Sequence, residues 1–537
     1  SFIFYSDVSC KVQAIYASDI DMERSVQMAF CTVLSLAIRG LDVEKIRVEA
    51  DVSNGLPMFH MVGYLSAEVK EASERVRTAI RNSGVKLPAK KIVVNLAPAT
   101  VRKKGASFDL PIALSVLAAL EYIPKESLKD VIVLGELSLD GKIHGISGVL
   151  PMIMEAERSG YRQCILPAEN VKEGALVKGM QILPAKSLEE ICMCLNGKTE
   201  IPVWNNMTEI VEEKDEEQYD FSEIHGQKAV KRAAEIAVAG GHNLLMVGPP
   251  GAGKSMIARR IATILPELSR EESLEITKIY SILGNVDPDH PLITRRPFRS
   301  VHHTVTRAAL IGGGVIPNPG EISLAHGGVL FLDELAEFHK PVLEVLRQPL
   351  EEHKIRISRN SGCYEYPADF MLIAAMNPCP CGNYPDLNKC NCTKTQIQNY
   401  LGHVSQPFLD RMDLCVEASR VEYRELHKTG KEETSAEIQN RVCTARKIQQ
   451  KRYEGTDIRT NSGIGVRQME EFCQIGEKEE KLMRRAFTTM NLTARTYHKV
   501  LKVARTIADL DGEEQIGCSH LKEALGYRML DKKYWGR

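Results

Sequence analysis

The stretch LLMVGPPGAGKS at residues 244–255 decides the fold class, because it joins an apolar run to a loop with the spacing GxxxxGK[ST]. The helical run MIARRIATIL follows it directly from Met256. The glycines let backbone N–H groups close around a phosphate, and the N-terminus of the helix adds partial positive charge. The sequence therefore predicts a strand, a phosphate-binding loop and a helix of an α/β nucleotide-binding domain.

Every residue of this loop is a candidate for contact with ATP. We expect Lys254 to reach the β- and γ-phosphates and the Ser255 hydroxyl to bind Mg²⁺. The candidate set is Gly248, Pro249, Pro250, Gly251, Ala252, Gly253, Lys254 and Ser255.

Two further apolar runs end in polar residues that suit ATP hydrolysis. Residues 329–332 (VLFL) precede Asp333, which we expect to hold Mg²⁺ through its water shell, and Glu334, which we expect to polarise the attacking water. Residues 371–376 (MLIAAM) precede Asn377, whose amide can hold that water or the γ-phosphate. The alternative for Asn377 is the cap of a turn before a proline.

The composition is that of an ordinary globular protein. With 44% hydrophobic and 26% charged residues and a net charge of -1, the chain has no global attraction to nucleic acid, so any DNA contact must come from local basic patches. The longest apolar stretch, residues 110–120, is too short to span a bilayer, and the first residues lack a secretory signal. We expect a cytoplasmic protein with no membrane partner and with most of its 14 cysteines reduced.

Patterns along the chain predict a multidomain α/β fold. Short β-branched runs alternate with helical patterns before residue 195, a solvated acidic run (EEKDEEQ) begins at Glu212, and helical periodicity dominates after Ser435. The expected segments are an atypical arm at 1–30, an α/β domain at 31–195, an acidic linker at 196–222, an ATPase domain with a parallel sheet at 223–430 and an all-α lid at 431–537.

Four cysteines form a candidate metal site. Cys379 and Cys381 make one C-x-C pair, and Cys390 and Cys392 make a second pair after a short polar loop. Four thiolates suit tetrahedral Zn²⁺ in a structural site, although the C-x-C spacing is tighter than in most zinc fingers. Four reduced buried thiols are the alternative, because disulfides are disfavoured in the cytoplasm. The paired histidines at 302–303 have no third ligand nearby and are interpreted as structural.

Several blocks resemble the magnesium-chelatase-like branch of the AAA+ ATPases, and most closely its ComM/YifB competence-protein subfamily. The resemblance extends from residue 31 to residue 530 and implies an AAA+ core with ATP and Mg²⁺ as cofactors. The blocks that carry it are HGQKAVKRAAEIAVAGGHNLL (225–245), NPGEISLAHGGVLFLDELAEF (318–338), VSNGLPMFHMVG (52–63), KIVVNLAPATVRKKGASFDLPIAL (91–114), NPCPCGNY (377–384), FLDRMDL (408–414) and LTARTYHKVLKVARTIADL (492–510).

At matching positions the resemblance implies two arginines that act on the nucleotide. Arg411 matches the arginine finger, which reaches the ATP of a neighbouring subunit and neutralises charge on the γ-phosphoryl group. Its alternative is an ordinary salt bridge with Asp410 or Asp413. Arg495 matches sensor 2, through which the helical domain responds to the nucleotide. A finger acting in trans requires an oligomer, and the resemblance implies a homohexameric ring.

The same branch carries two insertions that the resemblance places towards the pore of the ring. One would include the block at 297–320, and the other is a hairpin around 351–370. Alternation in the hairpin places Lys354 and Arg356 on one face, where they and Arg359 could hold DNA phosphates without contacting bases. The alternative is that these cations only solvate a surface hairpin.

The N-terminal α/β domain resembles the proteolytic domain of Lon proteases in two blocks, residues 96–120 and 134–151. Ser107 falls at the position of the nucleophile, but Leu150 occupies the position of the lysine base. Without a base the hydroxyl is a poor nucleophile. We therefore expect this domain to serve binding or assembly.

Together these features predict an ATP-hydrolysing, ring-forming motor that acts on single-stranded or branched DNA. The resemblance implies branch migration during recombination in natural transformation. The alternative from another class is a chelatase-type motor that remodels a protein partner for metal insertion. A non-hydrolysing ATP switch is disfavoured by the intact Asp333–Glu334 pair, and a protease is disfavoured by Leu150.

Overall fold

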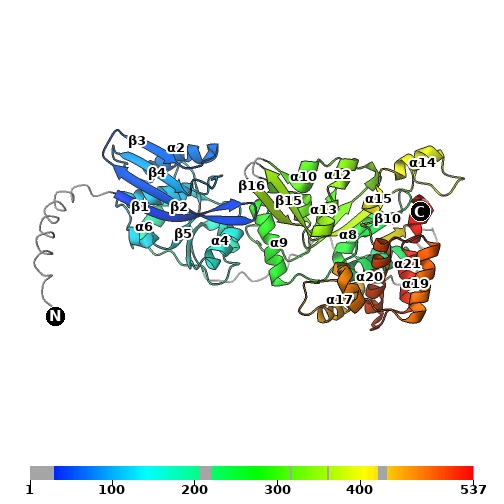
Figure 1. Ribbon diagram of the computed structural model, residues 1–537. Helices are drawn as coiled ribbons and strands as arrows, with labels where there is room; N and C mark the ends of the chain where they lie inside the picture. The colour runs from blue at the N-terminus through cyan, green and yellow to red at the C-terminus, as the bar shows by residue number, and fades with distance from the viewer. Residues whose placement is uncertain (1–28, 205–218, 315–316, 360–361, 421–431, 536–537) are drawn as a thin grey trace, which may run out of the picture. The chain divides into compact units, whose positions relative to one another are not determined.

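The structure is a computed structural model and describes residues 29–204, 219–314, 317–359, 362–420 and 432–535. These residues form two compact units, traced in Figure 1. Unit 1 comprises the described residues up to 204 together with Ser281–Pro291, and unit 2 comprises the described remainder. The EEKDEEQ run and nearly all of the expected arm lie outside the described residues. The expected domain boundaries stay a prediction.

Unit 1 is built on a seven-stranded mixed sheet with strand order β3-β4-β2-β1-β5-β8-β9. β2 pairs antiparallel with both β1 and β4, whereas β5, β8 and β9 continue in parallel from β1. The strands are β1 (Ala29–Arg39), β2 (Asp42–Ser53), β3 (Met58–Val62), β4 (Lys91–Ala97), β5 (Val131–Val133), β8 (Gln163–Pro167) and β9 (Gln181–Ala185), with a small hairpin of β6 (Glu136–Leu137) and β7 (Ile143–His144).

The helices of unit 1 follow from their apolar spacing. α2 (Ala67–Asn82) buries residues three and four positions apart and leaves its charged face exposed, as a surface helix does. α3 (Asp109–Ala119) is buried at every residue, so the longest apolar run of the chain is a core helix. The remaining helices are α4 (Val149–Arg158), α5 (Val171–Gly174) and α6 (Leu188–Leu195). The expected strand and helix patterns of this Lon-like α/β domain are confirmed.

Unit 2 contains a five-stranded sheet, β11-β14-β17-β10-β18, in which every pair is parallel. Because parallel strands present their carboxyl ends at one edge, the loops after β10, β14 and β17 meet there. The strands are β11 (Phe298–Val301), β14 (Val329–Leu332), β17 (Met371–Met376), β10 (Leu244–Val247) and β18 (Leu414–Glu417).

Helices and two hairpins surround this sheet. The helices of the ATPase part are α7 (Lys228–Gly240), α8 (Lys254–Ile261), α9 (Arg270–Ile282), α10 (Arg307–Ile311), α11 (Glu321–Leu324), α12 (Lys340–Glu344), α13 (Arg347–Glu352), α14 (Lys394–Leu401) and α15 (Gln406–Leu409). The hairpins are β12 (Gly312–Gly313) with β13 (Asn318–Pro319), and β15 (Lys354–Arg359) with β16 (Gly362–Pro367).

One expectation about the insertions is wrong. The block at 297–320 was expected to lie entirely in an insertion, but its first residues form β11, which pairs with β14 in the central sheet. Phe298 and Val301 supply the apolar contacts of this edge strand, and Phe298 stacks on Phe331 with ring centroids 5.9 Å apart. The insertion therefore begins after β11. The expected hairpin before β17 is confirmed as β15–β16.

The C-terminal part of unit 2 is all helical, as expected. α17 begins with a capping box, in which the Thr434 hydroxyl and the Glu437 carboxylate each accept a backbone N–H of the other residue. Its buried residues share one hydrophobic core with the central sheet. The helices are α17 (Ser435–Arg452), α18 (Met469–Phe472), α19 (Glu477–Thr489), α20 (Ala494–Asp511), α21 (Cys518–Gly526) and α22 (Met529–Trp535).

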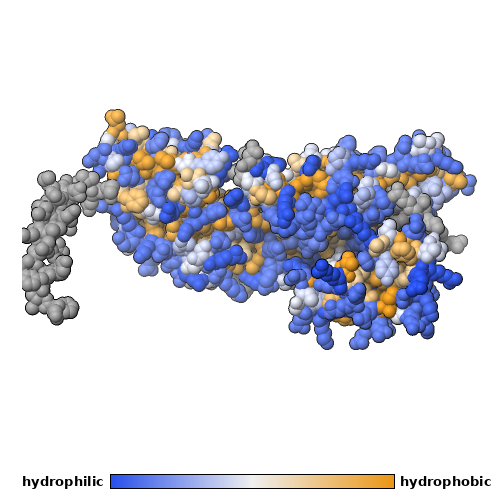
Figure 2. Space-filling model, viewed as in Figure 1, coloured by the Kyte–Doolittle hydropathy of each residue, from blue (hydrophilic) through white to orange (hydrophobic). Residues whose placement is uncertain are grey.

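The surface of the described residues is mostly hydrophilic on the face that Figure 2 shows, with apolar side chains scattered among the polar ones. Within the described residues no helix has the length and apolar content that a membrane span requires.

Candidate nucleotide-binding site

The phosphate-binding loop lies between β10 and α8, where the sequence places it. Gly251 and Gly253 have φ angles of +77° and +80°, a left-handed conformation that a β-carbon disfavours. Gly253 is the N-cap of α8, so the helix begins at Lys254 and its N-terminus faces the loop. A cavity of about 300 Å³ opens here and is lined by residues 250–256 of the loop together with Asp333, Glu334, Met376 and Asn377.

Lys254 lines this cavity and is held by three hydrogen bonds. Its Nζ donates to the carbonyl oxygens of Gly248 (2.7 Å) and Pro249 (3.0 Å) and to Oδ1 of Asn377 (3.1 Å). Burial lowers the pKa of Lys254, and the carboxylates of Asp333 and Glu334 oppose that shift. The contact with Asn377 brings the amide at the end of β17 beside the lysine that would hold the phosphates.

Asp333 and Ser255 form the candidate magnesium site. The Ser255 hydroxyl donates to Oδ2 of Asp333 at 2.5 Å, so two oxygen atoms meet at the start of α8. A carboxylate and a hydroxyl beside a phosphate site are the ligands that Mg²⁺ takes in P-loop enzymes. The arrangement fits Mg²⁺ bound together with ATP.

Glu334 lies at the same edge in a strained backbone conformation. Its φ angle is +52°, unusual for a residue with a side chain, and its backbone N–H donates to Oδ1 of Asp333 at 2.9 Å. The Nδ1 atom of His303 lies 3.1 Å from a carboxylate oxygen of Glu334, in ion-pair range but without hydrogen-bond geometry. His303, interpreted from the sequence as structural, therefore contacts the expected catalytic acid.

The contact of His303 was not visible in the sequence, because it depends on the pairing of β11 with β14. His303 follows β11 by two residues, and Glu334 follows β14 by two residues. Neighbouring parallel strands bring such residues together. The imidazole also packs edge-on against Phe338, with centroids 6.4 Å apart.

Arg411 and Arg495 lie in a different place. Both line a cavity of about 1340 Å³ in unit 2, and among the described residues neither lines the cavity of the phosphate-binding loop. Arg411 Nη2 donates to Oε1 of Glu351 at 2.5 Å, while its Nε has no partner. Burial lowers the pKa of Arg411, with Glu351 opposing the shift and Arg495 adding to it.

The alternative prediction, a salt bridge of Arg411 with Asp410 or Asp413, named the wrong partners. Asp410 accepts a hydrogen bond from Gln406, and Asp413 pairs with Lys499 at 2.8 Å. Arg411 instead pairs with Glu351 at the end of α13. The Arg411 side chain is 8% exposed, lines the open cavity and keeps one buried N–H without a partner in the described part of the chain.

The cations of the β15–β16 hairpin share one counterion. Lys354 Nζ lies 3.0 Å and Arg356 Nε lies 2.9 Å from the carboxylate of Glu365 on the opposite strand. Arg359 contacts the carbonyl oxygens of Gly314 and Ser358. The predicted common face of Lys354 and Arg356 is present, and Glu365 is a partner that the sequence alone did not reveal.

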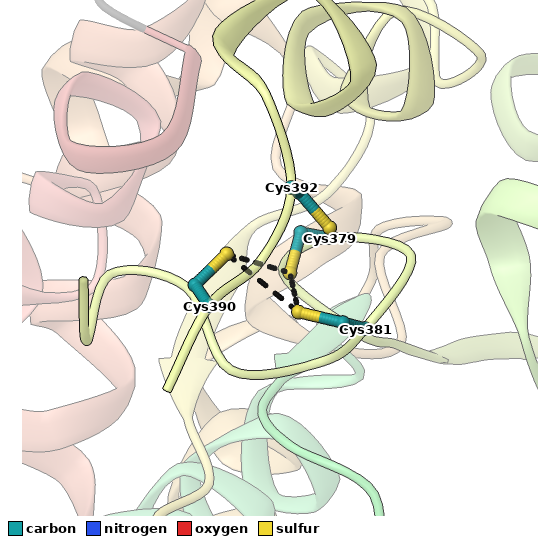
Figure 3. A group of neighbouring side chains, drawn as sticks. All are labelled: Cys379, Cys381, Cys390 and Cys392. Carbon is teal, nitrogen blue, oxygen red and sulfur yellow. Dashed lines mark hydrogen bonds between the residues drawn. The ribbon is translucent and has the colours of Figure 1, made fainter. Parts of the chain in front are cut away.

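The four cysteines come together after β17 (Figure 3). Their sulfur atoms all lie within 4.8 Å of one another, and none forms a disulfide. Cys379 is fully buried, whereas the other three are partly exposed. A backbone hydrogen bond from Asn383, helped by one from Asn391, lowers the pKa of Cys381 to about 6, which favours a thiolate at neutral pH.

In unit 1, Ser107 matches the position of the Lon nucleophile, but the position of the lysine base is occupied by Leu150. Leu150 lies in α4 and is fully buried, and its backbone N–H donates to the Glu173 carboxylate at 2.9 Å. Of the lysines close in sequence, Lys142 is exposed and pairs with Asp140 at 3.1 Å, and Lys103 is buried with its Nζ donating to the carbonyl oxygen of Pro98. The expectation that this unit does not hydrolyse peptides stays a prediction.

Comparison with known proteins relates almost the whole chain to others. The family described as magnesium chelatase, subunit ChlI, matches residues 220–426, and models of other ChlI regions match 48–170 and 432–528. Competence protein ComM of Haemophilus influenzae is 42% identical over 509 residues, which cover 94% of this chain and 98% of that protein. Protein YifB of Escherichia coli is 42% identical over 508 residues, with the same coverage. The Lon protease of Trichlorobacter lovleyi is 28% identical over 182 residues, 32% of this chain and 22% of that protein.

Proposed function

The chain belongs to the magnesium chelatase ChlI-like family of AAA+ ATPases, in the branch of ComM and YifB, and from this we propose that it is an ATP-hydrolysing, ring-forming motor that moves DNA. The name of its relative, competence protein, supports a role in recombination during natural transformation, where such a motor would drive branch migration. The proposed motor would use ATP and Mg²⁺, and Zn²⁺ bound by the four cysteines would be a structural ion.

The observation that supports ATP hydrolysis best is the convergence of groups at the phosphate-binding loop. Lys254 contacts Asn377, and Ser255 contacts Asp333, across three neighbouring strands of one sheet. When bound, MgATP would supply the γ-phosphoryl group and the metal charge. Lys254 would then hold the phosphates, Ser255 and Asp333 would hold the ion, and Glu334 would orient the attacking water.

The separate cavity of Arg411 and Arg495 supports an oligomer. An arginine that neutralises charge in the transition state must reach the γ-phosphoryl group, and neither arginine lines the loop cavity of its own chain. We therefore propose that both act on ATP bound by a neighbouring copy, and that the copies close into a homohexameric ring.

The β15–β16 hairpin supports DNA as the substrate. Lys354 and Arg356 stand on an exposed face of the hairpin beside a single carboxylate, so the three side chains leave a net positive charge. Exposed cations of this kind hold phosphates without regard to base sequence, and salt weakens that contact. Glu365 moderates the attraction, which suits a surface that must release DNA at each step.

The experiment that tests this function is the steady-state ATPase rate of the full chain with and without single-stranded and forked DNA, at about 50 mM and about 200 mM salt. We expect DNA to raise the rate at low salt and the increase to fade at high salt. The variant Lys354→Ala/Arg356→Ala should lose the increase and keep the rate without DNA. The matched control is Arg484→Ala, which removes an exposed arginine paired with Glu480 on α19.

The outcomes separate the two candidate functions. A rate that no DNA changes, with the double variant equal to Arg484→Ala, would leave an ATPase and contradict the DNA motor. A chelatase-type motor that remodels a protein partner would then be the function to test. No ATP turnover under any condition would contradict the motor itself.

A further inference from the structure

The four cysteines lie where a bound ion would act on the nucleotide site. We infer that Cys379, Cys381, Cys390 and Cys392 bind one Zn²⁺, and that this ion holds the loop after β17 against the phosphate-binding loop, so that ATP turnover requires zinc. The zinc site itself stands on the geometry of the sulfur atoms. Its effect on turnover rests on the proposed ATPase function.

The distances between the sulfur atoms fit a tetrahedral ZnS₄ site. Sγ of Cys379 lies 3.4 Å from that of Cys381 and 3.8 Å from that of Cys390, and the last two are 3.6 Å apart. With Zn–S bonds of about 2.3 Å, the edges of a tetrahedron are about 3.8 Å long. The sulfur of Cys392 completes the group, with all four within 4.8 Å.

The surroundings also match a structural metal site. The backbone N–H of Tyr384 donates to Sγ of Cys379 at 3.4 Å, and the amide of Asn383 lies 3.9 Å from Sγ of Cys381. Hydrogen bonds from N–H groups to the ligands stabilise the charge of bound thiolates, as outer partners of metal sites do. With four protein ligands and no open position, the ion would have a structural role.

The loop between the cysteines lies directly on the phosphate-binding loop. Gly382 has a φ angle of +76°, and a β-carbon added there would lie 2.2 Å from Cδ of Pro250. The backbone of Gly382 therefore packs against the ring of a residue that lines the nucleotide cavity. Because Gly382 is bonded to Cys381, an ion on that cysteine would fix the distance between the Gly382 backbone and the Pro250 ring.

The same ion would fix the amide beside Lys254. Cys379 follows Asn377 by two residues, so a metal ligand stands next to the residue that contacts Nζ of Lys254. On the other side of the cluster, Cys392 leads into α14, whose Tyr400 receives a backbone hydrogen bond from Asn377. Asn377 is thus connected to the first cysteine pair through the chain and to the second pair through Tyr400 of α14. An ion bound by all four cysteines would link these two connections.

The first experiment measures metal in the purified full chain by elemental analysis. We expect about one zinc ion per chain, retained after dialysis and released by a thiol-modifying reagent, as four thiolate ligands require. Replacement of zinc by Co²⁺ should give the visible absorption bands of a tetrahedral tetrathiolate site. A chain with neither zinc nor Co²⁺ bands, or with iron in place of zinc, would overturn the zinc assignment.

The second experiment separates the ion from the fold. Cys390→Ser/Cys392→Ser changes the two ligands that are farther along the chain from Asn377, and Cys443→Ser on α17 is the matched control. We expect the double variant to lose zinc and to lower ATP turnover about 10²-fold, because a displacement of about 1 Å in a catalytic group has that effect. The control should keep both. If the double variant does not fold, reversible loss of turnover on zinc removal from the unaltered chain, restored by Zn²⁺ alone, provides the same test.

A third variant tests the contact with the loop directly. Gly382→Ala should retain zinc and lose turnover, because its β-carbon collides with Pro250. Gly512→Ala is its control, since Gly512 has nearly the same φ angle, +75°, and no atom within 4 Å of its added β-carbon. Unchanged turnover in both the zinc-containing Gly382→Ala variant and the zinc-free Cys390→Ser/Cys392→Ser variant would overturn the coupling. An unaltered chain that binds zinc but never hydrolyses ATP would contradict the proposed function and leave the zinc site standing.

Discussion

Two cavities of unit 2 are lined by different residues. One lies at the phosphate-binding loop, and the other is lined by Arg411 and Arg495. The first gathers a lysine, an aspartate and an amide from the ends of three strands, but no arginine lines it among the described residues. The second is larger and its described lining includes no residue of the phosphate-binding loop, but it does include five arginines: Arg296, Arg411, Arg446, Arg459 and Arg495. If both cavities take part in the proposed transfer of a phosphoryl group, each would supply groups that the other does not contain.

In the proposed ring, this difference would make the two cavities complementary parts of one catalytic site shared between neighbouring copies. Lys254, Asp333 and Asn377 would hold MgATP in our proposal. Arg411 donates to Glu351 and to the Pro407 carbonyl oxygen, and only its Nε is without a partner among the described residues. A buried N–H without a hydrogen-bond partner is costly, so a further acceptor would stabilise this guanidinium. The phosphate of a nucleotide on a second copy is an anion of the right charge and geometry.

The largest effect expected is that of Arg411→Ala, which should lower ATP turnover by about 10³–10⁵-fold with ATP affinity nearly unchanged. The reason is that, in the proposed ring, Arg411 would contribute only to the transition state on a neighbouring copy. Turnover should be measured for the variant alone and after mixing with Glu334→Gln chains. Mixed rings would contain interfaces with an intact Glu334 and an intact Arg411, so mixing should restore part of the rate.

That mixing experiment can break the comparison between the two cavities. If each chain used its own arginine, no mixed interface would be complete and the mixture would stay inactive. A variant that turned over ATP normally would remove Arg411 from catalysis altogether. The exposed control Arg484→Ala should behave as the unaltered chain in both assays.

The next effect in size is that of Glu334→Gln, for which we expect turnover to fall by about 10²–10⁴-fold, as for loss of a general base. Glutamine keeps the size of the side chain and the contact region of His303, so ATP should still bind. Measuring nucleotide affinity and single-turnover hydrolysis separates the two steps. Near-normal hydrolysis would show that the attacking water is oriented by another group, with Asn377 the first to examine.

The sequence predicted the first cavity far better than the second. Residues 244–247, 329–332 and 371–376 are apolar runs that end in functional residues, so local pattern and motif spacing were enough to place Lys254, Asp333 and Asn377. The pairing of Arg411 with Glu351 and the shared cavity with Arg495 depend on how α13 and α20 pack. No periodicity in the sequence records such packing.

Two other differences have physical reasons of the same kind. β11 was missed because Arg299 and Ser300 interrupt its apolar pattern, as polar residues do in an edge strand that has one neighbour. Arg299 is accommodated by a two-pronged pair with Glu321 at 2.7 and 2.8 Å. The role of Glu365 as counterion was not predicted, because its contacts with Lys354 and Arg356 depend on the register of the hairpin.

A smaller effect should follow from His303→Ala, which sharpens the description of the first cavity. The imidazole nitrogen lies 3.1 Å from one carboxylate oxygen of Glu334, so its removal would free the acid to orient water. We expect the rate without DNA to rise, by up to about fivefold, since a partly exposed pair is worth at most about 1 kcal/mol. Turnover should be compared with His302→Ala, which leaves the contact intact. A fall in rate would instead make His303 a supporting residue for Glu334.

The smallest effect expected is that of Glu365→Gln, and it concerns how the hairpin is linked to the arginine cavity. β15 begins two residues after the end of α13, and α13 carries Glu351, the partner of Arg411. One short segment of chain therefore connects the hairpin to the residue that holds the arginine. Removing the carboxylate frees Lys354 and Arg356 for phosphates, and the slope of log affinity against log salt should steepen by about one charge. Fluorescence anisotropy with single-stranded DNA at several salt concentrations measures this slope. An unchanged slope would mean that the two cations do not contact DNA, and the hairpin would then be a solvated surface whose link to Arg411 has no part in holding the substrate.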